Sequence, residues 1–234
     1  LNECERYYRK RQFHLSRYEM VLSYMALGGI PYYLDLLRRE RTLTENLDEI
    51  FFRKSNAKQE FEDVYVGLFN SKDNYVGIVR ALGSRFYGMT RNEISEAIGQ
   101  KSGGGLSKML ENLEESDVIR TYTRYGGPQK VTVYQLVDFF TLFHFHFKSE
   151  RKTHGNQQWT NIQQKPEFYS WAGHTFETLT LLHVEQIKKK LGITGVVSNN
   201  YSWRQAANDE TPAMQIDLLI DRNDNTINLC EIKF

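Results

Sequence analysis

The chain has 234 residues, of which 40% are hydrophobic and 25% charged, the composition of a globular protein with one large domain or two smaller ones. Thirty basic residues against 29 acidic ones leave a net charge of +1, so a nucleic-acid partner must be argued from local patches. The two cysteines, Cys4 and Cys230, lie at opposite ends of the sequence, which argues against a zinc site or a secreted disulfide framework.

The sequence contains no signal peptide and no apolar run near the ~20 residues that a membrane-spanning helix needs. We therefore expect a cytoplasmic location and no membrane partner. The first residue is Leu1 rather than Met, and it opens a charged, helix-like stretch. This beginning indicates a piece of a longer protein.

Residues 1–70 are predicted to form a helical segment. The run SRYEMVLSYMALGG places an apolar stripe at three- and four-residue spacing, formed by Tyr18, Val21, Leu22 and Met25. The runs YYLDLLRRE and TENLDEIFF repeat the period. Helices this short need tertiary partners, so we expect a small bundle. We expect four aromatic side chains to pack in its core: Tyr32, Tyr33, Phe51 and Phe52.

Residues 71–137 are predicted to form a winged helix-turn-helix. The run YVGIVRALG (75–83) is typical of a short amphipathic helix, and Thr90 with Glu93 forms a capping box for the next helix. The turn QKSGGG leads into a third helix with an apolar face of Leu106, Met109, Leu110 and Leu113. The β-like runs TYTRY and VTVYQL follow, joined by GGPQK. The glycines at 103–105 lack the spacing of a phosphate-binding loop.

The charge of this segment weakly favours DNA. Residues 76–134 hold eight Lys or Arg and six Asp or Glu. The expected recognition helix carries DNA-binding candidates at its N-terminal end, where base-reading side chains sit: Lys101, Ser102, Ser107 and Lys108. The expected wing offers Arg120, Arg124 and Lys130 for phosphate contacts. The later turns of the helix are acidic, and a winged helix that serves as a spacer or binds protein remains the alternative.

Residues 138–234 begin with the aromatic run DFFTLFHFHF. His144 and His146 lie two residues apart in this run, and in a helix such residues do not face each other, so we interpret both as packing or interface histidines rather than metal ligands. A polar connector follows, then a helix from about Trp171 that stops at Gly192. Two short strands, in QIDLLIDRNDNTINLCEIKF, end the sequence.

The register of this last hairpin decides whether its acidic residues meet. In a strand alternate residues share a face, so Glu231 and Lys233 point the same way. An even-numbered turn sets Asp217 opposite Cys230 and separates the two carboxylates. A turn of three or five residues, or a bulge, sets Asp217 opposite Glu231. The sequence leaves both registers open.

If Asp217 and Glu231 converge, both carboxylates stay ionised comfortably only with a cation between them. Hard oxygen ligands favour Mg²⁺, held by one or two carboxylates with several waters retained, and such an ion can activate water against a phosphodiester. Lys233 would orient that water or help to deprotonate it. Without convergence, the hairpin is a surface element with solvated charges.

A helix with one acidic residue, then a strand with Asp, then a strand with Glu-x-Lys resembles the pattern of the PD-(D/E)XK nuclease superfamily. Here the pattern is Glu177, in GHTFETLTL, then Asp217, then Glu231-Ile232-Lys233. The resemblance implies that Glu177, Asp217, Glu231 and Lys233 are catalytic and that Asp217 and Glu231 bind Mg²⁺.

The ordered series of motifs resembles the C-terminal part of the archaeal-type AAA+ ATPases. LGGIPYYLDLL is similar to their helical segment after the ATPase, and YQLVDFFTLFHFHF is similar to the aromatic signature that ends their winged helix. WAGHTFE and QIDLLI…CEIKF resemble their nuclease-like domain. The match covers the chain from about Ser16 to Phe234. It implies a mixed α and α+β protein with a helical lid-like segment (1–70), a winged helix-turn-helix (71–137) and a partial PD-(D/E)XK-like α/β domain (138–234).

The chain departs from this family in three ways. The ATP-binding residues would precede Leu1, so ATP, and an oligomer formed through the ATPase part, are implied only for a region outside this sequence. Gln215 stands where the family usually has an acidic residue two before the motif Asp, and a common tryptophan is replaced in FHFHF. The sequence ends one residue after Lys233, so the nuclease-like domain would be partial.

Two functions follow from the sequence. In the first, the chain binds DNA through its winged helix and cleaves it at the Mg²⁺ site. In the second, the chain belongs to a non-catalytic regulatory or scaffold ATPase, with a decayed nuclease fold and a winged helix that binds a protein partner.

Overall fold

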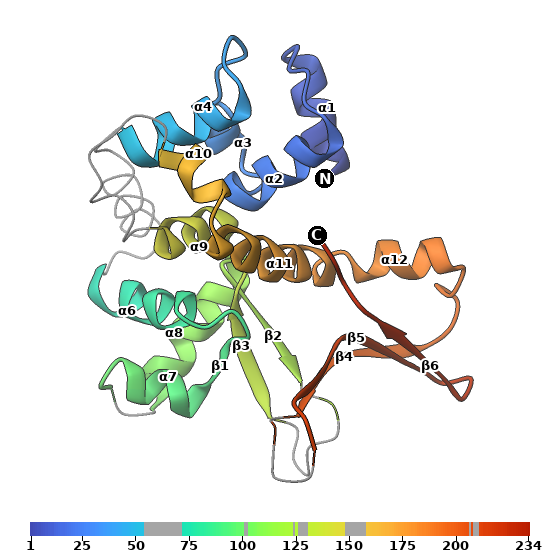
Figure 1. Ribbon diagram of the computed structural model, residues 1–234. Helices are drawn as coiled ribbons and strands as arrows, with labels where there is room; N and C mark the ends of the chain where they lie inside the picture. Colours follow the sequence, from blue (N-terminus) through green and yellow to red (C-terminus); the bar gives the residue numbers. More distant parts are fainter. Residues whose placement is uncertain are drawn as a thin grey trace.

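The computed structural model describes residues 1–53, 72–100, 103–123, 125, 131–147, 158–205, 207 and 211–234. Within them the fold is mixed α and β, with helices around two small antiparallel sheets (Figure 1). The described residues contain no helix that is long and apolar enough to cross a membrane.

The N-terminal helices are α1 (Asn2–Lys10), α2 (Arg17–Leu27), α3 (Pro31–Leu34), α4 (Leu43–Leu47) and the π-helix η1 (Asp48–Arg53). Capping boxes begin α2, at Ser16 with Glu19, and α4, at Thr42 with Glu45. The helix predicted from YYLDLLRRE ends early, at Leu34. Residues 54–70, which are also predicted to be helical, lie outside the described residues.

The predicted aromatic core of this segment is confirmed in part. Tyr33 is buried and stacks on Phe140 with ring centroids 4.1 Å apart, and Phe51 is buried as well. The prediction for Tyr32 is wrong, because its side chain is 58% exposed. On α2, Leu22 and Met25 are buried as the stripe predicts, but Tyr18 remains exposed at the start of the helix. Apolar periodicity therefore identifies the correct helix face but not where burial stops along it.

The middle of the chain has the predicted order of a winged helix: α6 (Lys72–Gly83), β1 (Met89–Thr90), α7 (Arg91–Ala97), α8 (Gly104–Glu115), β2 (Ile119–Thr123) and β3 (Thr132–Leu136). The short β1 pairs with β3, so the sheet order is β1-β3-β2. The capping box at Thr90 begins α7 as predicted. The predicted apolar face of α8 is buried, from Leu106 to Leu113.

Helix α9 (Phe139–His146) lies at the centre of the fold, between the N-terminal helices and the winged helix (Figure 1). Asp138 caps its N-terminus by accepting a hydrogen bond from the Thr141 backbone N–H at 3.1 Å. Phe143 packs among aromatic rings from three other elements, with Phe51, Trp159 and Trp171 at centroid distances of 4.2, 5.0 and 5.3 Å. His144 is buried and His146 half-buried, as their interpretation as packing histidines requires.

The remaining elements are α10 (Gln158–Gln163), α11 (Pro166–Leu181), α12 (Val184–Leu191), β4 (Ser198–Gln205), β5 (Met214–Arg222) and β6 (Thr226–Cys230). The single helix predicted from Trp171 to Gly192 is instead two helices, with a break at Leu182 and His183. The sequence also missed β4, which pairs with β5 to give the sheet order β4-β5-β6.

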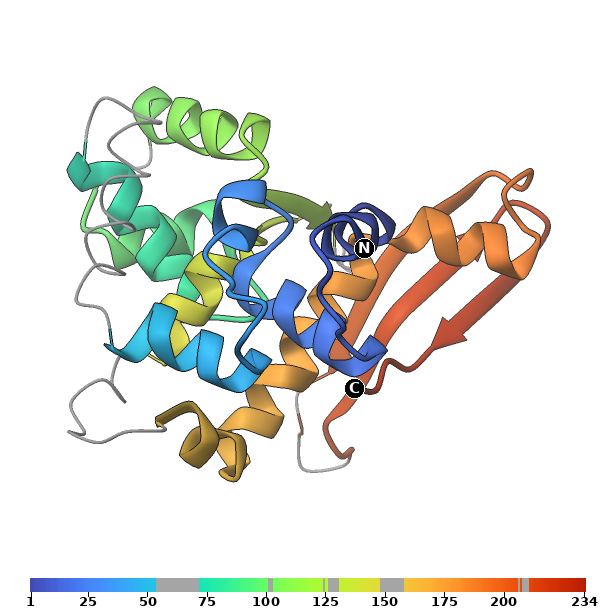
Figure 2. The ribbon, with the colours of Figure 1, turned by 90° about the horizontal axis from the view of Figure 1, so that it is seen from above.

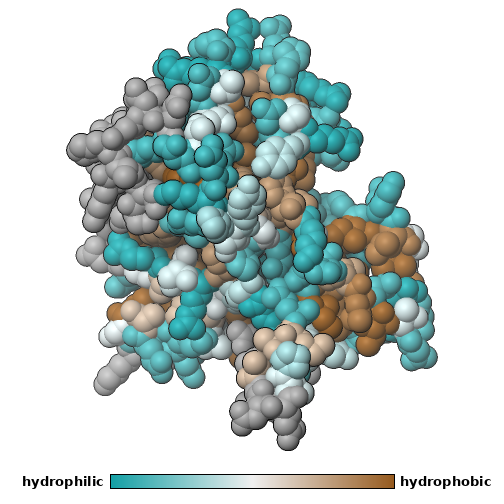
Figure 3. All heavy atoms as spheres, viewed as in Figure 1, coloured by the Kyte–Doolittle hydropathy of each residue, from teal (hydrophilic) through white to brown (hydrophobic). Residues whose placement is uncertain are grey.

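The C-terminal sheet extends to one side of the molecule, with α12 beside it (Figure 2). It has a small core of its own, in which Val184 and Ile193 pack on Leu218 and Ile220. Apolar side chains gather over this part of the surface (Figure 3). Its other neighbour is the wing, because β2 contacts β4 and the Tyr125 backbone N–H donates to the Ser202 carbonyl oxygen at 3.3 Å.

Gly88 offers a test of the winged-helix packing. Its φ is +68°, and a Cβ at this position would collide with the carbonyl oxygen of Tyr134 in β3. We expect Gly88→Ala to lower the free energy of unfolding by about 2–4 kcal/mol, through left-handed backbone strain and the collision together.

Urea denaturation followed by circular dichroism measures this loss, and Gly99→Ala is its matched control. Gly99 has a similar φ of +65°, but an added Cβ there meets no atom of the described residues within 4 Å. Gly99→Ala should therefore lower the free energy of unfolding by about 1–2 kcal/mol, through left-handed backbone strain alone. Equal losses in the two variants would contradict the tight approach at β3.

Candidate active site

The last hairpin has the register that brings the two acidic positions together. Its ladder runs from Arg222 opposite Thr226 to Leu218 opposite Cys230, so the turn holds three residues, and Asn225 adopts a left-handed φ of 60°. One step further in this register, Asp217 lies opposite Glu231. Of the two registers that the sequence leaves open, the structure has the odd one.

A hydrogen bond holds this register beyond the end of β6. The Ile232 backbone N–H donates to Asp217 Oδ2 at 2.8 Å. The other oxygen, Oδ1, accepts from the Gln215 side-chain amide at 2.6 Å. Each carboxylate oxygen has a second lone pair, so Asp217 keeps acceptor capacity for a further ligand.

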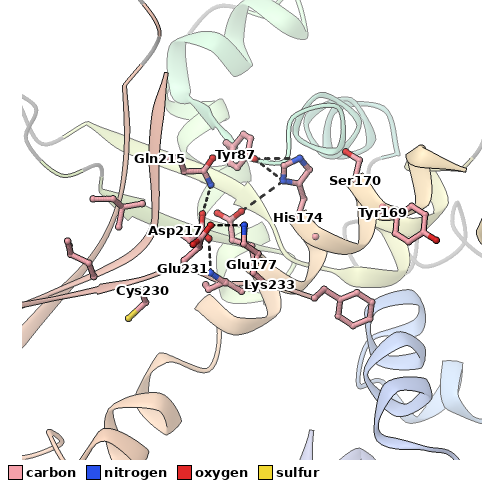
Figure 4. Close-up of a pocket in the computed structure, with 15 residues that line it drawn as sticks. Tyr87, Tyr169, Ser170, His174, Glu177, Gln215, Asp217, Cys230, Glu231 and Lys233 are labelled. Carbon is pink, nitrogen blue, oxygen red and sulfur yellow. Dashed lines mark hydrogen bonds and ion pairs between the residues drawn. The ribbon is translucent and has the colours of Figure 1, made fainter. Parts of the chain in front are cut away.

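A cleft of about 670 Å³ is lined by all four residues predicted to be catalytic, Glu177, Asp217, Glu231 and Lys233 (Figure 4). One wall is the face of α11 formed by Tyr169, Ser170, Gly173, His174 and Glu177. Opposite lie the start of β5 and residues 229–234. The fold therefore gathers side chains from helix α11, strand β5 and the segment that follows β6.

Glu177 and Glu231 differ in their environments. The Glu177 side chain is only 13% exposed, and its carboxylate lies 4.0 Å from His174 Nδ1. Glu231 is exposed and forms an ion pair with Lys233, whose Nζ lies 2.6 Å from its Oε1. The hydrogen bond and the charge of Glu231 raise the pKa of Lys233. Lys233 therefore stays a cation at neutral pH.

A metal ion would have to be held by few protein ligands. In the described ranges, no three or more His, Cys, Asp or Glu side chains are grouped closely enough to bind one ion. The predicted set of Asp217 and Glu231 is a pair, and Mg²⁺ is commonly held by one or two carboxylates with water completing its shell. These residues fit that ion chemically, provided that Glu231 exchanges its contact with Lys233 for the metal.

Sequence reasoning missed a polar network that joins the winged helix to this cleft. Tyr87 comes from the connection between α6 and β1, and its hydroxyl lies 2.8 Å from His174 Nδ1. The Arg204 guanidinium packs over the Tyr87 ring. Arg204 also donates to Gln215 Oε1 at 2.6 Å, which turns the Gln215 amide nitrogen toward Asp217.

Part of this network leaves a signal in the sequence. His174 precedes Glu177 by three residues on one helix, and Gln215 precedes Asp217 by two on one strand, so each pair shares a face. Tyr87 and Arg204 leave no such signal, because only the tertiary fold brings them to the cleft.

The predicted DNA-binding residues are only partly described. Lys101, Ser102, Arg124 and Lys130 lie outside the described residues. On α8, Ser107 is half-buried, and the exposed Lys108 lies 3.5 Å from Glu111. Arg120 is half-buried, donates from Nε to Gln135 Oε1 at 2.7 Å and packs over the Tyr122 ring. Burial lowers the pKa of Arg120. Its role in a phosphate contact stays a prediction.

No family model matches this chain, and no curated protein does. A solved structure that matches is MepR, a transcription regulator of the Staphylococcus aureus multidrug efflux pump MepA. It is 18% identical, and the match covers 58% of this chain and 90% of that chain with a TM-score of 0.30. A TM-score this low carries no argument about function.

His146 makes the stability of this region depend on pH. Phe86 contacts both His146 and His174, at centroid distances of 5.4 and 4.6 Å. Burial, with a smaller contribution from His174, lowers the pKa of His146 to about 4, and Glu167 opposes this shift. The Glu167 Oε1 atom lies 3.7 Å from the buried Nε2, which has no hydrogen-bond partner among the described residues. In the unfolded chain its pKa is about 6.5, so on acidification the unfolded state takes up a proton that the folded state does not.

When the pH falls from 7 to about 5, we expect His146 to lower the free energy of unfolding by about 2 kcal/mol. His146→Leu should flatten the dependence by that amount in urea denaturation at the two pH values. His14→Leu, at an exposed position before α2, should keep the wild-type slope. A wild-type slope in His146→Leu would mean that folding leaves the pKa of His146 near its value in the unfolded chain.

Proposed function

We propose that this chain is the C-terminal part of an archaeal-type AAA+ ATPase that binds DNA and carries a Mg²⁺-dependent PD-(D/E)XK nuclease-like site. The main support is the register of the last hairpin. It sets Asp217 opposite Glu231 in a cleft that Glu177 and Lys233 also line. We would not expect a surface hairpin with unrelated charges to combine this register with a carboxylate from a helix in the same cleft.

In this proposal Asp217 and Glu231 hold Mg²⁺, which when bound supplies an activated water and neutralises charge on the phosphodiester. Asp217 is oriented by two hydrogen bonds, so little conformational entropy is lost when it binds an ion. Lys233 remains cationic, which suits it to stabilise negative charge on a phosphate oxygen rather than to accept a proton. Glu177, beside His174, accepts hydrogen bonds that orient the water.

The winged helix is the proposed DNA-binding element. Its topology presents α8 at the position of a recognition helix. Lys108 and Ser107 lie toward its N-terminal end, whereas Glu111, Glu114 and Glu115 make its later turns acidic. We therefore infer that DNA approaches the N-terminal end of α8. ATP would be bound by residues outside this sequence.

Metal-dependent cleavage is the direct test. We expect Asp217→Asn and Lys233→Met to lower the rate at which a duplex with a single-stranded tail is cleaved with Mg²⁺ or Mn²⁺ by at least about 100-fold, since each removes a group from the reacting centre. Affinity for duplex DNA, measured by anisotropy in EDTA, should stay nearly unchanged.

Asp221→Asn is the matched control, because Asp221 shares the face of β5 with Asp217 but lies outside the cleft. It should cleave like the wild type. Equal cleavage by wild type, Asp217→Asn and Lys233→Met would reject the nuclease.

A substitution of Gln215 gives a second test, in which the variant should bind the metal ion more tightly than the wild type. Gln215→Glu keeps an acceptor for Arg204 and adds a carboxylate next to Asp217. A further unit charge about 5 Å from the ion is worth on the order of 1 kcal/mol in an exposed site. Calorimetric titration should therefore show about 5- to 10-fold tighter Mn²⁺ binding.

Gln186→Glu adds the same charge on the exposed surface of α12 and should leave the affinity at the wild-type value. Equal Mn²⁺ affinity in both variants and the wild type would place the ion away from Asp217.

The second candidate function is a regulatory or scaffold role without catalysis. Two observations favour it. Gln215 stands where the similar family usually has an acidic residue. In addition, Glu231 forms an ion pair with Lys233, so it would have to give up that contact to bind an ion together with Asp217. A folded protein that binds no divalent ion at millimolar concentration would support this second function.

A further inference from the structure

Three exposed aromatic side chains lie in the cleft or directly beside it. Tyr169 on α11 is 66% exposed, Tyr18 at the start of α2 is 53% exposed, and Phe234 after β6 is 42% exposed. Tyr169 and Phe234 line the cleft itself. We refer to Tyr18, Tyr169 and Phe234 as the aromatic rim.

The rings of this rim are organised. Tyr18 and Phe234 stack, with centroids 5.3 Å apart and planes inclined by 25°. Phe176 supports Phe234 from α11, at a centroid distance of 5.2 Å. Tyr169 lines the same cleft as Phe234. Three different elements therefore bring their rings to one place.

This exposure is not explained by packing. The aromatic side chains around α9 are almost all buried, and an exposed cluster of rings marks a binding surface more often than a scattered single ring does. Elsewhere, Tyr32 is equally exposed at 58%, but it lies outside the cleft and contacts its neighbour Tyr33.

Cations and open space accompany the rings. Lys233, 79% exposed, directly precedes Phe234, and the exposed Arg17 directly precedes Tyr18. Gly173 faces the cleft between Tyr169 and Glu177 on α11, and within the part of the chain that the structure describes a Cβ there would meet nothing within 4 Å. In Figure 4, Tyr169 lies across the cleft from Asp217. A ligand can therefore contact the rim and the carboxylates together.

Planar rings beside exposed cations are the surface that binds single-stranded nucleic acid, because bases stack on the rings and phosphates pair with the cations. In a duplex each internal base is covered on both faces by its neighbours, so its ring can stack on a side chain only after it leaves the helix.

We propose that the aromatic rim stacks on unpaired bases, so that the cleft takes a single strand, or the unpaired end of a duplex, rather than continuous double-stranded DNA. This substrate class rests on the proposed function. The winged helix then holds the duplex part, and the strand that enters the cleft is the unpaired one.

The test measures binding without cleavage, in EDTA, by fluorescence anisotropy. The probes are a single-stranded oligonucleotide, the same strand with abasic positions, and the duplex of that sequence. We expect Tyr169→Leu and Tyr18→Leu each to weaken binding to the normal strand by roughly 5- to 100-fold. Neither should change affinity for the abasic strand or the duplex. Both substitutions affect exposed side chains, and circular dichroism checks that the variants fold.

Tyr32→Leu is the matched control, with the same substitution at an equally exposed tyrosine away from the cleft, and it should bind like the wild type. Unchanged affinity in both rim variants would overturn the proposal. Equal wild-type affinity for normal and abasic strands would also overturn it.

The outcome separates the rim from the nuclease. Strand binding that depends on Tyr169 in a protein that cleaves nothing would keep the rim and reject the nuclease. Wild-type cleavage of unpaired ends by both rim variants would reject the rim and keep the nuclease.

Discussion

The packing of aromatic rings around α9 is the constraint on which the rest of the structure depends. Phe140 contacts the N-terminal helices through Tyr33, and Phe143 contacts η1, α10 and α11 through Phe51, Trp159 and Trp171. A close-packed interior transmits the position of one element to the next. Because α11 is fixed on one side by these rings, its opposite side presents Glu177 and His174 to the cleft at a defined place.

The cleft combines this rigid helix with a hairpin that is held by few contacts. The C-terminal sheet has only a small core, and the segment after β6 is tied to β5 by the hydrogen bond from Ile232 to Asp217. The exposed pair of Glu231 and Lys233 contributes little to stability, as is usual for surface ion pairs. One wall of the cleft is therefore preorganised, while the other can adjust to a ligand.

Much of this architecture could be predicted from the sequence, since it is written in local patterns. The capping box at Thr90 and the apolar face of α8 identify the winged helix. The sequence does not predict the break between α11 and α12, because no proline or glycine marks it. It does not predict β4 either, because SNNYSWRQ lacks an alternation of apolar and polar residues. The choice of hairpin register was out of reach, since Asn225 could adopt its left-handed conformation in turns of more than one length. The contacts of Tyr87 and Arg204 arise only when distant segments pack.

The position of Tyr87 has a thermodynamic consequence. This residue belongs to the winged helix, yet its hydroxyl is hydrogen-bonded to His174 in the cleft, and its ring lies under Arg204. A ligand that displaced the connection between α6 and β1 would have to break both contacts. By linkage, a ligand in the cleft that strengthens them must oppose that displacement by the same free energy. The two parts of the chain are thus coupled through one phenol, and each would sense occupancy of the other without any large rearrangement of the fold.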